Sequence, residues 1–339
     1  MKTLAIIFGI AFTFVPAARA QGPGVASGSG QSAPVLEGYL PGSGGARLFF
    51  RVVGSGSDTI IVIHGGPATG LKEGASLEPL ATHGYTLIFY DQRGAGMSEL
   101  VSSPAALGLA QHVEDLDAVR RRFQLNRVSL ITLSWGSAIA LHYAIAHPGN
   151  VERMALLNPF PPTGRDYVRR FAHLDSLRDA GTRKRLRAID SLWPVAPDSD
   201  LAALCRESAL TASKAYGGSG SRGRQPSGDV CDYPPDVLRH RRLAKVSAMR
   251  GMGAEYDFTA ALRRMGRPLL VVEGAASQLP LDASRVWARE AADGRMLLIP
   301  HSSHRTWLDQ PALLFTALDS FFRGNWPVGA SVVQPEKRQ

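Results

Sequence analysis

The chain has 339 residues, of which 45% are hydrophobic, and a formal net charge of +9 at pH 7. A chain of this size and composition buries a substantial core, and its length predicts one large domain that carries an insertion. The basic residues are spread along the chain, apart from one run at Arg183, Lys184, Arg185 and Arg187. That run is typical of a solvated helix face and comes without a nucleic-acid-binding motif, so we expect no nucleic-acid partner.

The N-terminal segment has the pattern of a secretory signal peptide. Lys2 supplies a positive charge, residues 4–15 are apolar, and residues 18–20 (Ala-Arg-Ala) match a cleavage site. The apolar run is too short to span a membrane comfortably. We therefore expect residues 1–20 to be removed on export to a periplasm or to the medium. Residues 21–34, rich in Gly and Ser, are then a flexible leader.

Cys205 and Cys231 are the only two cysteines of the chain. In an exported protein an isolated pair of cysteines is predicted to form one disulfide, here across the glycine-rich stretch Gly217–Gly228. Metal binding is the weaker alternative, because no histidine or further cysteine stands at ligand spacing near either residue.

Strands and helices alternate along most of the chain after the leader. The expected strands are residues 35–40, 46–53, 59–63, 85–90, 128–133, 153–157, 268–272 and 296–299. The expected helices of the same region are residues 107–123, 138–146, 284–292 and 311–322. This alternation predicts the α/β class, with a mostly parallel eight-stranded sheet covered on both faces and an antiparallel pair at its start. The core is expected to comprise residues 35–160 and 267–326.

The alternation is interrupted over residues 161–266. This segment is rich in Arg, Leu and Ala at helical spacing and contains no convincing β run. We interpret it as a helical cap inserted after the sixth strand, where it would exclude water from a site at the strand ends. The alternative is a helical decoration remote from the site.

A candidate nucleophile lies in the segment Leu130–Ser137, which reads LITLSWGS. A buried strand, one serine, small residues and then a helix form the pattern of a nucleophile elbow, in which a sharp turn exposes the hydroxyl of Ser134. The N-terminus of the following helix would stabilise an oxyanion at the same place. The alternative is an ordinary strand-to-helix junction.

A serine hydroxyl needs a base to become a nucleophile. His304 follows the last expected strand and precedes a helix, which is where the chain order serine, acid, histidine places that base. His301, three residues earlier, competes for the role. We favour His304 because we expect His301, at the strand end, to be packed or half-buried.

An oxyanion hole requires two backbone N–H donors. Trp135, directly after the serine, is expected to supply one. The other is expected from Gly66, in the loop His64-Gly65-Gly66-Pro67 that follows the third strand, because glycines let the backbone approach a substrate carbonyl. A plain glycine turn is the alternative.

Three motifs together resemble one family. HGGP (64–67), DQRGAGMS (91–98) and SWGS (134–137) are similar to the prolyl aminopeptidase (proline iminopeptidase) group of the α/β-hydrolases. The resemblance implies the α/β-hydrolase fold, Ser134 as nucleophile, His304 as base, and Gly66 and Trp135 as oxyanion donors. It implies that DQRG braces loops near the site, and it implies no cofactor. Relatives include exported peptidases and also esterases.

The sequence departs from the family pattern at the acid that orients the histidine. Similar sequences carry G-x-x-D after the seventh strand, whereas here Ser277 stands in place of the aspartate. Glu273 and Asp282 are the candidate substitutes, and we favour Glu273, for which a solvated or salt-bridged glutamate at a strand end is the equal alternative. The position after the sixth strand, where an acid would also serve, holds Asn158. Smaller departures are Ala68 and Thr132, where relatives carry glycine.

An aminopeptidase also needs an anion for the free amine of its substrate. Relatives place glutamates for this purpose in the cap, near tryptophans. The expected cap offers Trp193, Glu207, Asp229 and Asp232, among which Glu207 is the candidate and a surface acid is the plainer interpretation.

These expectations describe an exported serine hydrolase that cleaves an amide or ester of a small peptide or ester through an acyl-enzyme. A prolyl aminopeptidase is favoured and a carboxylesterase of the same fold is the alternative. Because the aspartate is missing, a degenerate, non-catalytic binding protein is the competing class. The sequence does not indicate an oligomeric state.

Overall fold

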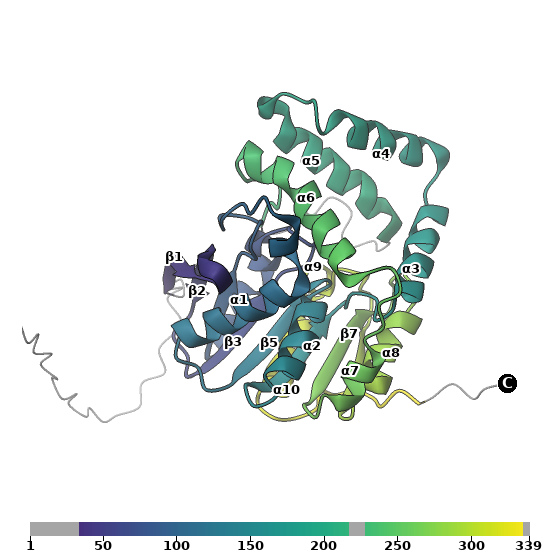
Figure 1. Ribbon diagram of the computed structural model, residues 1–339. Coiled ribbons are helices and arrows are strands. Elements are labelled where there is room, and N and C mark those ends of the chain that lie inside the picture. The colour runs from purple at the N-terminus through teal and green to yellow at the C-terminus, as the bar shows by residue number, and fades with distance from the viewer. Residues whose placement is uncertain (1–33, 217–227, 335–339) are drawn as a thin grey trace, which may run out of the picture. The chain divides into compact units, whose positions relative to one another are not determined.

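An eight-stranded sheet forms the centre of the computed structural model (Figure 1). Its strands follow the order β1-β2-β4-β3-β5-β6-β7-β8. Their bounds are β1 Val35–Pro41, β2 Arg47–Val53, β3 Asp58–Ile63, β4 Tyr85–Tyr90, β5 Val128–Leu133, β6 Val151–Leu157, β7 Leu269–Gly274 and β8 Gly294–Ile299. The β1–β2 and β2–β4 pairs are antiparallel, and every pair from β4 to β8 is parallel. The predicted mixed sheet is confirmed.

The sheet is buried on both faces, which explains why its parallel strands are continuous apolar runs. In β5, Leu130 packs into one core cluster, while Ile131 and Leu133 pack into the other. The first cluster takes in α1 (Leu109–Arg122), α2 (Gly136–Ala146), α7 (Thr259–Arg264) and α8 (Asp282–Glu290). The second takes in the 3-10 segment η2 (Leu71–His83), α9 (Thr306–Asp309) and α10 (Pro311–Phe322). Short 3-10 turns, η1 (Ser43–Gly45) and η3 (Pro104–Leu107), complete this region.

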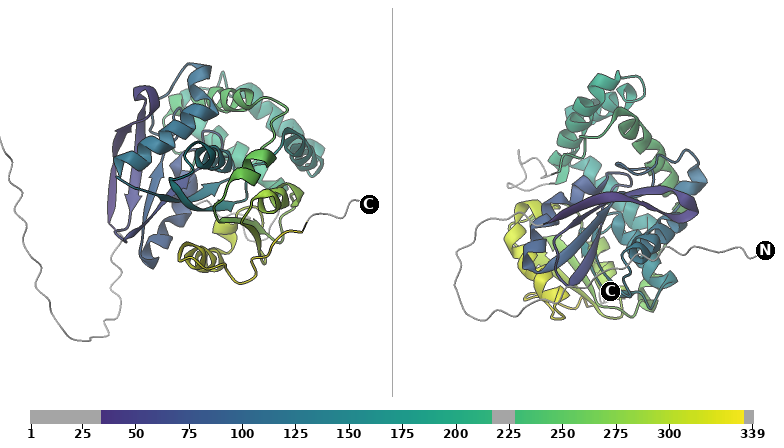
Figure 2. Two further views of the ribbon diagram at one scale, coloured as in Figure 1. Left: turned by 60° about the horizontal axis from the view of Figure 1, so that its bottom comes forward. Right: turned by 90° about the vertical axis from the view of Figure 1, so that its left-hand side faces the viewer.

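The inserted cap follows β6, as predicted. It contains α3 (Gly164–Ser176), α4 (Ala180–Leu192), α5 (Asp198–Ser213), the 3-10 turn η4 (Lys214–Tyr216) and α6 (Pro235–Met252). Figures 1 and 2 show these teal and green helices gathered on one side of the sheet. Phe258, Leu262 and Met265 around α7, which lie before the expected end of the cap at residue 266, pack into the core cluster of α2 and α8.

The structure describes residues 34–216 and 228–334. The expected signal peptide (1–20), all but the last residue of the expected leader (21–34), and most of the glycine-rich stretch lie outside these residues. Within the part that is described, no helix is long and apolar enough to cross a membrane.

The predicted disulfide is present. Cys205 of α5 and Cys231, in the segment before α6, are bonded with their Cα atoms 5.7 Å apart. The Arg241 guanidinium of α6 lies 3.4 Å from the Cys205 sulfur and also donates to the carbonyl oxygen of Val230. The disulfide thus joins two cap elements at a point that a third element also contacts.

Replacing both cysteines with serine is expected to lower the free energy of unfolding by roughly 3 kcal/mol, because a crosslink across a loop of this size limits the unfolded chain. Urea titration of the wild type and of the double variant measures the difference. Dithiothreitol should destabilise the wild type by a similar amount and leave the double variant unchanged. Equal midpoints for the two proteins would contradict the prediction.

Candidate active site

Ser134 occupies a tight turn between β5 and α2. Its φ is +44°, a region that costs energy for a residue with a side chain. The turn is held by the Ser134 carbonyl oxygen, which accepts from the backbone N–H of Ser137 at 3.0 Å and of Phe160 at 3.1 Å. A Cβ at Gly136 would lie 2.6 Å from the Ile63 carbonyl oxygen. Only glycine fits there, which is the close approach of helix and strand that the elbow pattern requires.

Ser134 and His304 line the same pocket, of about 140 Å³. The core and the cap both supply its walls. The core contributes Gly66, Pro67, Phe160, Pro161 and Leu279, and the cap contributes Tyr167, Arg170, Phe171, Leu174, Tyr216, Lys245 and Met249. The cap therefore covers the site, and the alternative of a remote decoration is wrong.

His301 and His304 differ in position. His301 is exposed and His304 is partly buried in the pocket wall, so the expectation that His301 is packed is wrong, although the preference for His304 agrees with the pocket. His301 lies two residues after the end of β8 and adopts φ +53°. His304 stacks on Tyr216 with ring centroids 4.9 Å apart. Burial, and then the charges of Arg170 and Arg305, lower the pKa of His304 well below its usual 6.5.

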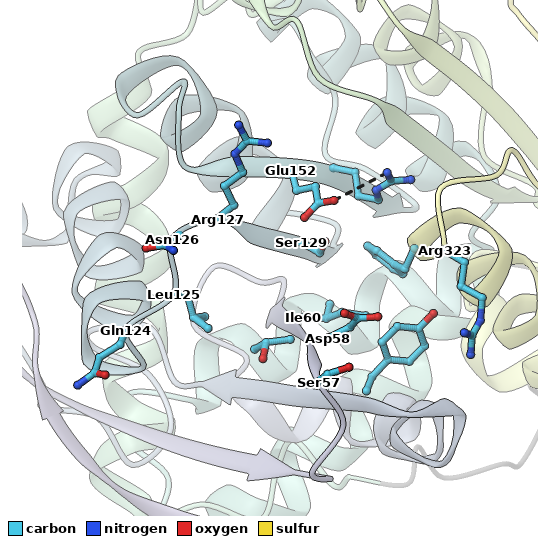
Figure 3. Close-up of a pocket in the computed structure, with 14 residues that line it drawn as sticks. Ser57, Asp58, Ile60, Gln124, Leu125, Asn126, Arg127, Ser129, Glu152 and Arg323 are labelled. Atoms are coloured by element: carbon cyan, nitrogen blue, oxygen red, sulfur yellow. Dashed lines mark ion pairs between the residues drawn. The ribbon is translucent and has the colours of Figure 1, made fainter.

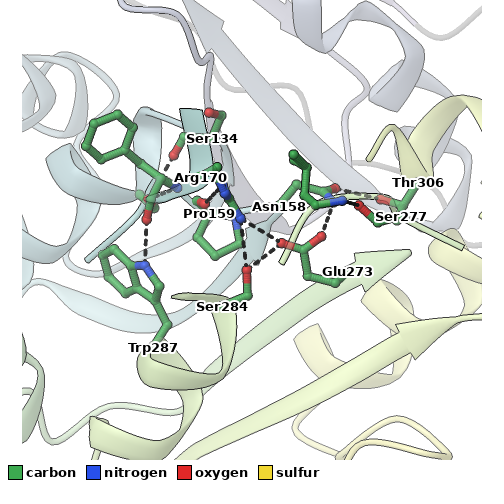
Figure 4. A network of polar contacts seen from close by, with 12 residues as sticks. Ser134, Asn158, Pro159, Arg170, Glu273, Ser277, Ser284, Trp287 and Thr306 are labelled. Carbon is green, nitrogen blue, oxygen red and sulfur yellow. Dashed lines mark hydrogen bonds and ion pairs between the residues drawn. The ribbon is translucent and has the colours of Figure 1, made fainter. Parts of the chain in front are cut away.

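Glu273 lies at the end of β7, fully buried, in a polar network (Figure 4). Its carboxylate accepts from the Asn158 side-chain amide at 2.6 Å and from the Ser284 hydroxyl at 2.5 Å. The Arg170 guanidinium lies 3.6 Å away. Burial raises the pKa of Glu273, and Arg170 opposes that rise. This is the environment of a structural, ion-paired glutamate.

The predicted contact of Glu273 with His304 is not present. The Nδ1 atom of His304 is buried and has no hydrogen-bond partner among residues 34–216 and 228–334. Asp282, the other candidate acid, instead pairs with Arg169 at 2.9 Å and is partly exposed at the start of α8. Ser277 accepts from the Leu279 N–H. Among the residues that the structure describes, no carboxylate bonds to the Nδ1 atom of His304.

Asn158 lies directly after the last residue of β6. It is fully buried with φ +51°, and its side-chain oxygen accepts from the Thr306 hydroxyl at 3.4 Å. The Asn158 amide thereby connects Glu273 of β7 to α9, the helix that directly follows His304. The network therefore supports the backbone near His304 and not the imidazole itself.

The glycine loop after β3 lies against Ser134. Gly66 lines the pocket with φ +117°, and a Cβ at Gly65 would lie 3.2 Å from the Cβ of Ser134. The Glu73 carboxylate of η2 accepts from the Gly65 N–H at 2.6 Å and from the Thr69 hydroxyl at 2.8 Å. Glu73 was not singled out from the sequence, because η2 has neither a clear helical nor a strand period. Its carboxylate holds the loop in place.

The DQRG segment braces this region, as the resemblance implies. The fully buried Asp91 accepts from the backbone N–H of Leu71 at 2.6 Å and of Met97 at 2.7 Å. Burial raises the pKa of Asp91 to about 7. Arg93 donates to both oxygens of Asp115 at 2.6 Å, a buried bidentate pair.

None of the proposed amine anchors lines the pocket of Ser134. Glu207 is partly exposed on α5 and pairs with Arg185, which lowers the pKa of that carboxyl. Asp232 pairs with Lys72 at 2.7 Å, and Asp229 lies beside it in a different pocket. The expectation that Glu207 could bind a substrate amine is therefore wrong for this pocket.

Larger depressions lie elsewhere on the molecule. One of about 760 Å³ is lined by residues at the amino ends of β3, β5 and β6, including Asp58, Ser129 and Glu152 (Figure 3). Parallel strands of α/β folds carry their active sites at the carboxyl ends, which is where Ser134 lies. No group of His, Cys, Asp or Glu in the described ranges is arranged to hold a metal ion.

Comparison with known proteins agrees with this geometry. Residues 58–183 match the family model described as alpha/beta hydrolase fold. A proline iminopeptidase of Levilactobacillus brevis is 25% identical over 299 residues, which cover 82% of this chain and 93% of that protein.

Solved structures with the same fold include more than one activity. A proline iminopeptidase from Mycobacterium smegmatis superposes with a TM-score of 0.66 at 20% identity, covering 85% of this chain and 98% of that one. A thermophilic esterase from Thermogutta terrifontis gives 0.61 at 19% identity over the same shares. At this identity the structures compare folds only. From the eight-stranded sheet and the family match together, the chain has the α/β-hydrolase fold, and its sequence is similar to that of proline iminopeptidases.

Proposed function

We propose that the protein is an exported serine hydrolase that cleaves an amide or ester bond of a small substrate through an acyl-enzyme. The observation that carries the proposal is that Ser134, at an elbow, and His304, from the far end of the chain, line one pocket beneath the cap. A serine hydroxyl and an imidazole that share one pocket are the groups that nucleophilic acyl transfer uses.

In the proposed reaction the Ser134 oxygen attacks the substrate carbonyl and His304 accepts the hydroxyl proton. The negative oxygen of the tetrahedral intermediate receives hydrogen bonds from the N–H groups of Gly66 and Trp135. His304 then donates its proton to the leaving group as the bond to the carbonyl carbon breaks. Water, deprotonated by His304, attacks the acyl-enzyme and releases Ser134.

Two substrate classes fit this chemistry. Similarity to proline iminopeptidases along most of the chain supports an aminopeptidase. The pocket itself favours a carboxylesterase, because none of the residues that line it is an Asp or Glu that could bind an amine. Hydrolysis of proline β-naphthylamide against 4-nitrophenyl butyrate separates the two. Ester turnover without arylamide turnover would count against the peptidase.

A fluorophosphonate probe tests the catalytic proposal directly. We expect labelling of the wild type and none of Ser134→Ala, because the probe reacts with an activated serine hydroxyl. Circular dichroism confirms that the variant is folded. A folded wild-type protein that resists the probe would instead support the non-catalytic binding protein.

The pH profile depends on His304. The neutral imidazole is the base, and because its pKa is lowered, it stays neutral through the whole neutral range. We expect kcat/KM to be flat above pH 6.5 and to fall only at more acidic pH. Arg305→Gln removes a cation that lowers this pKa, so the acidic limb should move upward towards pH 6.5. Arg187→Gln, an exposed cap position, is the control and should leave the profile in place.

Export is a separate part of the proposal. It rests on the N-terminal sequence alone, in which an apolar segment precedes Ala18-Arg19-Ala20. Mass spectrometry of protein from a non-cytoplasmic fraction should find Gln21 as the first residue. Protein that keeps Met1 and remains in the cytoplasm would contradict export and leave the catalytic proposal intact.

A further inference from the structure

The pocket of Ser134 carries only positive formal charge. Arg170 of α3 and Lys245 of α6 line it from the cap, and no Asp or Glu is among the residues that form its walls. Most of the remaining wall is aromatic or aliphatic, including Phe160, Phe171 and Leu174. Walls of this kind exclude water, and a charge in the pocket is therefore felt more strongly than on an open surface.

The two cations have different settings. Arg170 is almost fully buried, donates to the Pro159 carbonyl oxygen at 2.9 Å and lies 3.6 Å from Glu273, and its Nε has no partner in the described part of the chain. Lys245 is exposed at the pocket and makes no ion pair within those same residues. Arg170 is thus a fixed, partly compensated cation, and Lys245 is a free one.

The charges near His304 have the same sign as the charged residues of the pocket wall. The charges that act on the His304 ring are those of Arg170 and Arg305, both positive. Arg305 directly follows His304 and has no ion pair in the described ranges. Burial raises the pKa of Tyr216, which stacks on this ring, while Arg170, Arg178 and Arg305 oppose that rise and Glu73 adds to it. Both charges that lower the pKa of His304 are therefore positive, in agreement with the two cations of the pocket wall.

We propose that the substrate is an ester or amide whose acyl part carries a carboxylate, and that Lys245 and Arg170 bind this carboxylate in the pocket of Ser134. The inference rests on the proposed hydrolase function and names its substrate class. A free amine would meet two like charges in this pocket and no carboxylate, whereas a carboxylate would meet a free ammonium group and a preset guanidinium. The acyl part is the part that stays bonded to Ser134, next to these walls, until water releases it.

Binding without chemistry gives the first test. Glutarate, a small dicarboxylate, is titrated into the Ser134→Ala variant in a calorimeter, with glutaramide as the uncharged probe of equal size. We expect saturable binding of glutarate and at least tenfold weaker binding of glutaramide. Adding Lys245→Met should weaken glutarate binding about fivefold, the upper range for one solvent-exposed ion pair. Lys184→Met removes an equal charge from the exposed face of α4 and should change nothing.

Kinetics give the second test. The ratio of kcat/KM for 4-nitrophenyl hydrogen glutarate to that for its methyl ester measures the preference for a free carboxylate. We expect a ratio of at least 10 in the wild type, a fall of about fivefold in Lys245→Met, and a further fall in Lys245→Glu, where the charge is reversed. Lys184→Met should keep the wild-type ratio.

The experiments distinguish failure of the anionic-substrate inference from failure of the hydrolase proposal. A ratio near 1, equal binding of glutarate and glutaramide, or an equal loss in Lys184→Met would overturn the anionic substrate while ester turnover still stands. If no ester is cleaved and the fluorophosphonate does not react, the hydrolase proposal fails. The calorimetric comparison then still decides whether the pocket binds a carboxylate.

Discussion

Replacing Ser134 with alanine is expected to lower kcat for any substrate that the wild type cleaves by roughly 10⁶-fold, the loss found when a serine nucleophile is removed. The reason is local: the elbow places the hydroxyl of Ser134 in a pocket that His304, the proposed base, also lines. Stopped assays with a chromogenic ester measure the loss. Because Ser134 sits at φ +44° in a turn held by backbone bonds, the alanine variant should remain folded.

A double variant tests whether Ser134 and His304 act as one catalytic unit or contribute to kcat independently. If Ser134 and His304 act together, Ser134→Ala combined with His304→Ala should cost no more than either single change. His301→Ala is the matched control, since His301 is exposed and does not line the pocket, and its kcat should remain within about twofold of the wild type. Equal losses in the two histidine variants would contradict the assignment of His304.

Glu273→Leu is expected to lower the free energy of unfolding by about 3–5 kcal/mol, the cost of breaking a buried ion pair. The change leaves the nearly buried Arg170 guanidinium without its carboxylate and removes the acceptor of the Asn158 and Ser284 donors. Urea unfolding followed by tryptophan fluorescence measures the change. Asp282→Leu, which breaks a partly exposed pair with Arg169, should cost at most about 1 kcal/mol.

The milder Glu273→Gln variant distinguishes a structural role from an orienting one. Since no hydrogen bond joins Glu273 to His304, kcat should fall less than tenfold while stability falls measurably. An acid that fixed the tautomer of the imidazole would instead cost about 10⁴-fold in kcat when made an amide. A loss of that size at unchanged stability would restore Glu273 as the orienting acid.

The sheet and its catalytic edge could be predicted from the sequence because the relevant signals are local. The strand at Tyr85–Tyr90 and the strand at Val128–Leu133 have the predicted bounds, since each is a short apolar run ended by polar or small residues. Ser134 and His304 follow strands that run in the same direction. Residues after such strands meet at one edge of a parallel sheet, so their shared pocket follows from topology.

The remaining features depend on contacts between distant segments, which carry no local signal. The cap residues of the pocket, such as Arg170 and Lys245, lie in helices whose many arginines look alike in the sequence. The partners of Glu273 come from residues 115 and 11 positions away, so nothing near it in the chain distinguishes an orienting acid from a structural one. Glu73 is placed by η2, an irregular segment that contains Pro79.

The contacts of Arg241 matter for any experiment that exchanges the cap of this protein for that of a relative. Its guanidinium donates to the carbonyl oxygens of Ala68 at 3.0 Å and Thr69 at 3.2 Å, just past Gly66, while it also contacts Cys205 and Val230. The cap therefore covers the pocket and also fixes the backbone that follows Gly66. A chimera whose cap comes from a relative without an equivalent arginine would leave the backbone after Gly66 without these hydrogen bonds. It would lose turnover even where the new cap packs well on the core.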